Sequence, residues 1–307
     1  MTADELVLVE RIGMKVHHLN CGTCCPIGGH LFDGYSTGVS AHLVCHCLLI
    51  ETDNGLVLVD TGYGAQDIAR PRDRLSRFFI ALNRPQLRPE ETAVAQVRRL
   101  GFDPSDVRHI VVTHLDFDHA GGIEDFPNAR VHVTAREKEV ADERKGGAFV
   151  SRKRYRPQQW NDAANWSLYP LGGGEPWFGF DAVRDLQGLP PEILLVPLAG
   201  HTWGHAGVAV LEDSGRWLFY AGDAYFQNGE IRGDHRTCPP GLRAYQRLME
   251  VDAAARIANQ RRLRALAGQQ SDAIRIFCAH DLTEFERLSL QERPTSHPAL
   301  ATLPGNL

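Results

Sequence analysis

The chain has 307 residues, of which 43% are hydrophobic and 23% charged, and its formal net charge is −5. This composition is ordinary for a globular protein with a sizeable core, the acidic balance argues against a nucleic-acid partner, and no run approaches the roughly 18 apolar residues of a membrane span. The cysteine count of seven is odd, and residues 1–5 lack the basic and apolar regions of a secretory signal. We therefore expect reduced thiols and a cytoplasmic protein.

The first third of the chain predicts three strands, at residues 14–20, 42–51 and 56–60. Cys21, Cys24 and Cys25 lie between the first two strands among Gly and Pro residues. A Cys-x-x-Cys pair can form half a zinc site or a redox pair, but no second pair completes a structural zinc site. We favour a structural loop of small residues over a redox role.

Two helices are expected next. Residues 66–89 are rich in Arg and Pro and place Leu75, Phe78, Phe79 and Leu82 at helical spacing. This excursion either packs on its own subunit or forms a lid or subunit contact, and both alternatives stay open. Residues 90–100 predict a helix that ends at Gly101.

The densest cluster of candidate metal ligands follows a short apolar strand at residues 110–112. His114, Asp116, Asp118 and His119 lie within six residues, before Gly121 and Gly122. Imidazole beside carboxylate suits a divalent transition metal. The alternative is a polar turn whose histidines cap a helix, but such a cluster directly after a buried strand has no packing purpose.

The rest of the chain supplies further candidates, each just after a predicted strand. A strand at 130–134 and a surface helix at 135–144 come first, and an aromatic-rich insertion at about 146–190 either packs on the domain or walls a substrate pocket. Strands at 193–198, 217–220 and 274–278 then precede His201, Asp223 and His280, and residues 242–267 predict one long helix. Loops at strand ends on one rim of a sheet converge, so we predict a single site.

The segment Thr113-His-Leu-Asp-Phe-Asp-His-Ala-Gly-Gly resembles the Thr-His-x-His-x-Asp-His-Ala-Gly-Gly loop of the metallo-β-lactamase superfamily. The segments around Asp60, His201, Asp223 and His280 resemble further motifs of that family in the same order, nearest its N-acyl-homoserine-lactone lactonase-like branch. The resemblance implies an α/β fold: an αββα sandwich of two packed mixed β-sheets flanked by helices. It implies one domain over residues 1–307, with the excursion at about 66–89 and the insertion at about 146–190.

The resemblance also implies a binuclear centre. One ion would be held by His114 and His201 and the other by Asp118, His119 and His280, with Asp223 bridging and Asp60 bracing the metal loop. Two divalent ions, foremost Zn²⁺, would share a hydroxide that attacks a carbonyl. Asp118 would pass a proton to the leaving group, and the phenol of Tyr225 would donate to the developing oxyanion.

Asp116 departs from the family pattern, which has a histidine there. If Asp116 is a ligand, its negative charge shifts the preference toward harder ions such as Mn²⁺ or Fe²⁺. If the side chain of Asp116 is too short to reach the first ion, that ion position binds metal weakly and the centre is mononuclear. We favour ligation because a buried carboxylate needs a nearby cation.

These observations predict a metal-dependent hydrolase that opens a lactone or cleaves an ester of a small molecule. The alternatives are a thioesterase similar to glyoxalase II and a non-catalytic metal- or ligand-binding member of the fold. Neither nucleic acid nor membrane is an expected partner, and a homodimer is left open.

Overall fold

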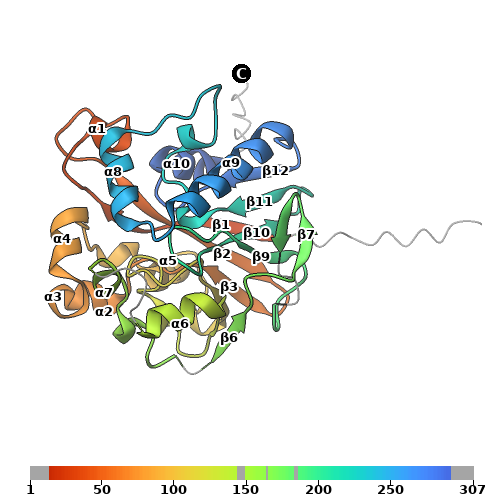
Figure 1. Cartoon of the computed structure of the whole chain (residues 1–307). Helices are drawn as coiled ribbons and strands as arrows, with labels where there is room; N and C mark the ends of the chain where they lie inside the picture. Colours follow the sequence, from red (N-terminus) through yellow and green to blue (C-terminus); the bar gives the residue numbers. More distant parts are fainter. Residues whose placement is uncertain (1–13, 144–148, 164, 183–185, 292–307) are drawn as a thin grey trace, which may run out of the picture.

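The computed structural model describes residues 14–143, 149–163, 165–182 and 186–291, and two mixed sheets lie at its centre (Figure 1). The first sheet has the spatial order β1 (Lys15–Cys24), β2 (Leu43–Thr52), β3 (Gly55–Val59), β4 (Val107–Val111), β5 (Arg130–Thr134) and β6 (Trp166–Tyr169). The second has the order β12 (Ile274–Phe277), β11 (Trp217–Tyr220), β10 (Ala206–Leu211) and β9 (Ile193–Pro197). A separate hairpin pairs β7 (Glu175–Trp177) with β8 (Phe180–Ala182).

Alternate residues along the strands form three apolar layers. Ile50 and Val57 of the first sheet meet Leu195 and Val208 of the second in the layer between the sheets. The intervening residues face outward and are covered by helices, so the strands are apolar on both faces, as expected for sheets buried on both sides. This arrangement is the predicted αββα sandwich.

Helices cover both outer faces (Figure 1). α5 (Ala93–Arg99) and α6 (Ala135–Glu143) pack on the first sheet through an outer apolar layer, and α9 (Ala253–Gln269) packs on the second sheet through another. The remaining helices are α1 (His30–Asp33), α2 (Ala65–Ala69), α3 (Pro71–Arg74), α4 (Arg77–Asn83), α7 (Ser151–Arg154), α8 (Pro240–Met249) and α10 (Leu282–Gln291). Within the described ranges, no helix is long and apolar enough to cross a membrane.

The prediction of one helix over residues 242–267 is wrong. The chain forms α8 and α9 instead, separated by residues 250–252. Asp252 caps α9 by accepting a hydrogen bond from the amide of Ala255 at 2.9 Å. The amides of Val251 and Asp252 both donate to the carbonyl of Gly200, so the break is anchored to the loop that carries His201.

The two predicted excursions pack against the sandwich. Residues 66–89 form α2, α3 and α4 rather than one helix, and Leu75 and Phe79 are buried beside Phe117 of the metal loop. In the insertion, Trp160 packs in the layer beneath α5 and α6, and Trp177 packs in the layer beneath α9. These aromatic residues therefore pack on the body of the protein.

Candidate metal centre

All seven candidate ligands lie at one rim of the sandwich, in loops that follow β4, β9, β11 and β12. They are buried, and the two most exposed are Asp118 at 7% and His280 at 5%. This pair therefore marks the side of the centre that is closest to solvent.

Asp60 organises the metal loop from beneath. Its carboxylate accepts hydrogen bonds from the amide and hydroxyl of Thr113, each at 2.8 Å, and from the hydroxyl of Tyr220 at 3.0 Å. It also lies 2.8 Å from Nδ1 of His119, which donates to it and therefore keeps its lone pair on Nε2. Asp60 has a φ of 55°, a strained conformation for a non-glycine residue that these four bonds hold in place.

Four side chains surround a first candidate ion position. The Oδ2 atom of Asp116 lies 3.4 Å from Nε2 of His114 and 3.2 Å from Nε2 of His201. The Oδ2 atom of Asp223 lies 3.8 Å and 3.2 Å from the same two nitrogens. Ligand atoms around a tetrahedral zinc ion are separated by roughly 3.3–3.6 Å. Nε2 of His114 is buried without a hydrogen-bond partner, so the four residues, here called the first quartet, fit a divalent ion.

A second quartet consists of His119, His280, the other oxygen of Asp223, and Asp118, which has a carboxylate oxygen within 4.8 Å of a ring nitrogen of His280. Oδ1 of Asp223 lies 3.3 Å from Nε2 of His119 and 3.1 Å from Nε2 of His280, and the two nitrogens are 3.4 Å apart. Nδ1 of His280 donates to the carbonyl of Val44 at 2.7 Å, so both rings direct Nε2 lone pairs at a carboxylate oxygen. Lone pairs facing an anion need a cation between them, and this quartet also fits a divalent ion.

Asp116 has a cationic partner that the sequence did not reveal. Nε and Nη2 of Arg154 each lie 2.5 Å from one carboxylate oxygen of Asp116, and both side chains are fully buried. Burial raises the pKa of Asp116, but the guanidinium outweighs it and holds the pKa well below its usual range. Asp116 is therefore an anion. Its Oδ2 atom is the oxygen that faces the other members of the first quartet.

The family model of the metallo-beta-lactamase superfamily matches residues 42–280. The chain belongs to that superfamily. It is 44% identical over 270 residues to the probable metallo-hydrolase Rv2300c of Mycobacterium tuberculosis, covering 87% of this chain and 80% of the relative. It is therefore a metallo-hydrolase.

Other relatives are lactonases. The N-acyl homoserine lactonase AiiA of Bacillus thuringiensis subsp. kurstaki is 30% identical over 127 residues, which is 41% of this chain and 51% of the relative. A solved structure of an N-acyl homoserine lactone hydrolase, with N-hexanoyl-L-homoserine at its catalytic metal centre, superposes with a TM-score of 0.67. The two chains are 21% identical, and the match covers 90% of this chain and 97% of that one, which shows the shared fold.

Glu137, which the sequence analysis did not identify, forms hydrogen bonds with both the loop that follows β4 and the loop that follows β9. One carboxylate oxygen accepts from the amide of Leu115 at 3.0 Å, and the other accepts from the hydroxyl of Thr202 at 2.6 Å and the amide of Gly204 at 3.2 Å. The prediction of a surface helix over 135–144 is therefore wrong for this residue, which is fully buried. A Glu in the first turn of a helix is typical of any helix, so its sequence position gave no signal.

His205 supports the centre without facing an ion position. Its Nδ1 donates to the carbonyl of Leu198 at 3.0 Å, and its Nε2 accepts from the backbone amide of Asp223 at 2.9 Å. The ring therefore fixes the backbone of the residue that both quartets share.

The expected role of Tyr225 stays a prediction, and its hydroxyl has another partner in the structure. Its hydroxyl donates to the carboxylate of Glu284 at 3.1–3.2 Å, and its ring lies in the apolar layer beneath α9. Phe226 faces the centre instead, stacked on His280 with ring centroids 5.0 Å apart. Tyr245 of α8 packs against Phe226, with ring centroids 5.9 Å apart. Burial raises the pKa of Tyr245, and the charge of Asp118 raises it further.

The cysteines near the centre are free thiols. Cys21 and Cys24 lie within β1 rather than in the predicted loop. Cys45 has its sulfur within 4.8 Å of ligand atoms of Asp118 and His280. A hydrogen bond with Cys24 and burial raise the pKa of Cys45 well above its usual value.

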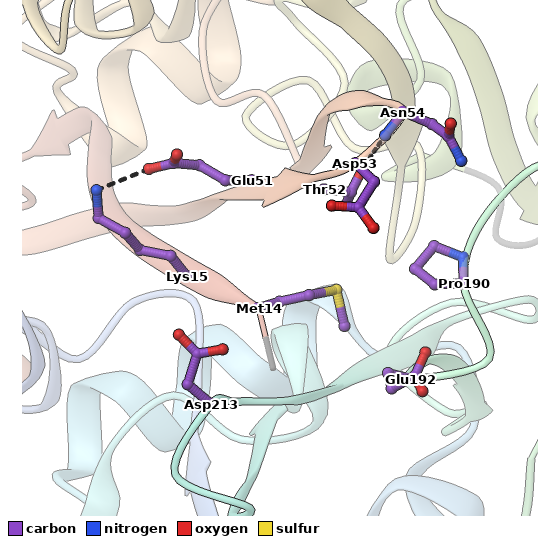
Figure 2. A pocket seen from close by; sticks show the side chains of 9 residues that line it. All are labelled: Met14, Lys15, Glu51, Thr52, Asp53, Asn54, Pro190, Glu192 and Asp213. Atoms are coloured by element: carbon purple, nitrogen blue, oxygen red, sulfur yellow. Dashed lines mark hydrogen bonds and ion pairs between the residues drawn. The ribbon is translucent and has the colours of Figure 1, made fainter. Parts of the chain in front are cut away.

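A separate cavity of about 420 Å³ lies at the opposite rim, beside the β2–β3 turn (Figure 2). Its lining includes Lys15, which pairs with Glu51, and the carboxylates of Asp53, Glu192 and Asp213. No ligand candidate contributes to this lining, so the cavity is distinct from the metal centre.

Proposed function

We propose that this metallo-hydrolase opens a lactone or cleaves an ester of a small, partly apolar substrate. The proposal rests on the position of Asp223, whose two carboxylate oxygens face two separate histidine pairs. A shared carboxylate of this kind suits two divalent ions, foremost zinc, with Mn²⁺ or Fe²⁺ as alternatives because of Asp116. Such ions, when bound, activate water and polarise the carbonyl that it attacks.

The chain's own residues supply the proton transfer. Asp118 is the most exposed member of the quartets. Burial raises its pKa above the ordinary value, although His119 and His280 oppose the shift. We assign the proton transfer to the leaving oxygen to Asp118 because its carboxylate lies at the side of the centre closest to solvent.

Tyr245 is the proposed donor to the oxyanion, in place of Tyr225. Asn83 donates to its phenol oxygen at 3.2 Å, which leaves the phenol proton available for a substrate. Its ring contacts that of Phe226, with centroids 5.9 Å apart, so it stands next to the side chain that covers His280. One such donor contributes about 10²–10³ in turnover in acyl-transfer enzymes.

The apolar surroundings of the centre support a substrate with a hydrophobic part. Tyr63, Phe117, Phe226 and Tyr245 belong to one apolar cluster, which is extended by side chains of α4 and α8. Together with the partial likeness to the Bacillus lactonase, this cluster favours an acyl-bearing lactone or ester.

The test is a substrate panel with the zinc-loaded full-length protein. It contains N-acyl homoserine lactones of increasing acyl length, simple lactones, aryl esters and a glutathione thioester, with acid release followed by titration. We expect lactone or ester hydrolysis that Asp223→Asn abolishes and the exposed-site control His42→Asn retains. Turnover of the thioester alone would favour a thioesterase, and no turnover by metal-replete protein would favour the non-catalytic alternative.

A further inference from the structure

The Asp116–Arg154 pair is the feature of the centre that the family pattern does not contain. The guanidinium approaches as a fork, with Nε on Oδ1 and Nη2 on Oδ2 of the carboxylate, both at 2.5 Å. Both contacts are charge-assisted hydrogen bonds between a guanidinium and a carboxylate. A bidentate Arg fixes the plane of a carboxylate, which a Lys ammonium cannot do.

Arg154 is itself held in place. Its Nη1 donates to the carbonyl of Met249 at 2.7 Å and to that of His201 at 3.3 Å. The backbone of the next residue, Tyr155, forms an isolated antiparallel bridge with Asp116. The side chain is fully buried, so both its charge and its position are set by the fold.

The guanidinium contacts two members of the first quartet, Asp116 and His201, and Nε2 of His201 accepts a hydrogen bond from it. Nη2 is 2.6 Å from Nε2 of His201 as well as 2.5 Å from Asp116. Among the described contacts of Arg154, none is to His114 or Asp223, and Nε2 of His114 has no hydrogen-bond partner. The quartet keeps the ligand spacing of a divalent ion with the guanidinium beside it.

The Asp116–Arg154 pair balances the charge of the metal centre. With Asp116 in place of a histidine, the two quartets contain three carboxylates instead of two, because Asp118 and Asp223 are already present. One buried guanidinium offsets the added negative charge, and it does so next to the residue that introduced it.

We propose that Arg154 is a positioning residue that neutralises Asp116 and turns its Oδ2 atom toward the first ion, so that the Asp–Arg pair replaces the histidine of the family motif. The inference rests on the proposed two-ion centre. It makes residues 116 and 154 a single unit, so that replacing both is tolerated better than replacing Asp116 alone.

The experiment is a double-mutant cycle on the full-length protein, with Asp116→His, Arg154→Met and both changes together. The readouts are zinc per chain, the dissociation constant of the weaker zinc ion by chelator competition, and the visible spectrum of the Co²⁺-loaded protein. We expect two ions in the wild type. Asp116→His should weaken binding of the ion in the first quartet about 10- to 100-fold, because an unpaired guanidinium then faces it.

The double variant should regain an affinity close to that of the wild type. A double variant no better than Asp116→His, or an Asp116→His variant with normal affinity, would overturn the proposal. One tightly bound ion in the wild type would also overturn it, since the guanidinium would then stand in place of the first ion.

Arg154→Lys keeps a buried cation and tests orientation even if the other variants fail to fold. We expect an altered Co²⁺ spectrum because the fork is lost, and an unchanged spectrum with unchanged affinity would refute the orienting role. The substrate panel separates the two proposals. If the wild type binds two ions and the double-mutant cycle gives the expected affinities, but no substrate is hydrolysed, the proposed function is refuted. The proposed role of the Asp116–Arg154 pair would still hold.

Discussion

The carboxylate of Asp60 and the ring of His119 form a hydrogen bond of 2.8 Å that determines which nitrogen of His119 faces the metal centre. Asp60 accepts three further hydrogen bonds, from both the backbone and side chain of Thr113 and from Tyr220. One residue thus positions a ligand, the start of the metal loop and the end of β11.

Asp60→Asn should weaken metal binding without changing a single ligand. The amide keeps one acceptor oxygen but places an NH₂ group against donors, so the orientation of His119 is no longer fixed. We expect metal affinity to fall about 10- to 100-fold, measured by chelator competition. Asp53→Asn, in the exposed β2–β3 turn, is the matched control, and equal affinities in the two variants would contradict the bracing role.

Asp223→Ala should abolish metal loading, His119→Ala should remove the ion of the second quartet, and both should abolish activity while the fold survives. Asp223 contributes to both quartets, so its loss should remove both ions, whereas His119 belongs to the second quartet. Elemental analysis, with circular dichroism as a check on folding, distinguishes these outcomes. A metal-replete and active His119→Ala variant would show that the site assignment is wrong.

The two tyrosines provide a matched pair of tests. Tyr245→Phe should lower kcat about 100- to 1,000-fold at unchanged metal content, the range expected for one oxyanion donor. Tyr225→Phe should leave kcat unchanged and lower the free energy of unfolding by about 1–2 kcal/mol, because it removes a buried hydrogen bond to Glu284. The reverse pattern would restore Tyr225 to the mechanism.

Glu284 should make stability depend on pH. Burial raises its pKa from 4.5 to about 7. The folded state therefore holds this proton more tightly than the unfolded chain. The resulting stabilisation is complete below pH 4.5 and is lost as the pH rises through 7, a change of about 3 kcal/mol.

The variant Glu284→Gln removes that titration. Denaturant unfolding between pH 4.5 and 8 should show the wild type losing stability relative to Glu284→Gln as the pH rises. Glu139→Gln, on the exposed face of α6, serves as the control. Parallel stability curves for the wild type and Glu284→Gln would contradict the shifted pKa.

The strands and the ligand loops could be predicted because their signals are local. Residues 130–134 form a strand with the predicted bounds, and His114, His201 and His280 each follow a short apolar run that became a strand. Strand ends on one rim then bring distant loops together without knowledge of any contact. The bridging position predicted for Asp223 came instead from the family resemblance.

Residues that act through long-range contacts escaped prediction. Arg154 lies in the basic run 152–156, which is typical of an exposed surface, and only its contact with Asp116 reveals its burial. Tyr225 and Phe226 are adjacent, and only the fold decides which of them faces the centre. The break between α8 and α9 depends on the carbonyl of Gly200, which is 51 positions before Val251.

The pairing of Asp116 with Arg154 across 38 positions also restricts how this sequence can evolve. A change at either position alone leaves an unbalanced charge inside the protein, so a lineage can cross between the two ligand types only by altering both. We expect relatives with a carboxylate at the first position to carry arginine at the second, and relatives with a histidine to have lost it. Residues 116 and 154, although separated by β5 and α6, should therefore be substituted together.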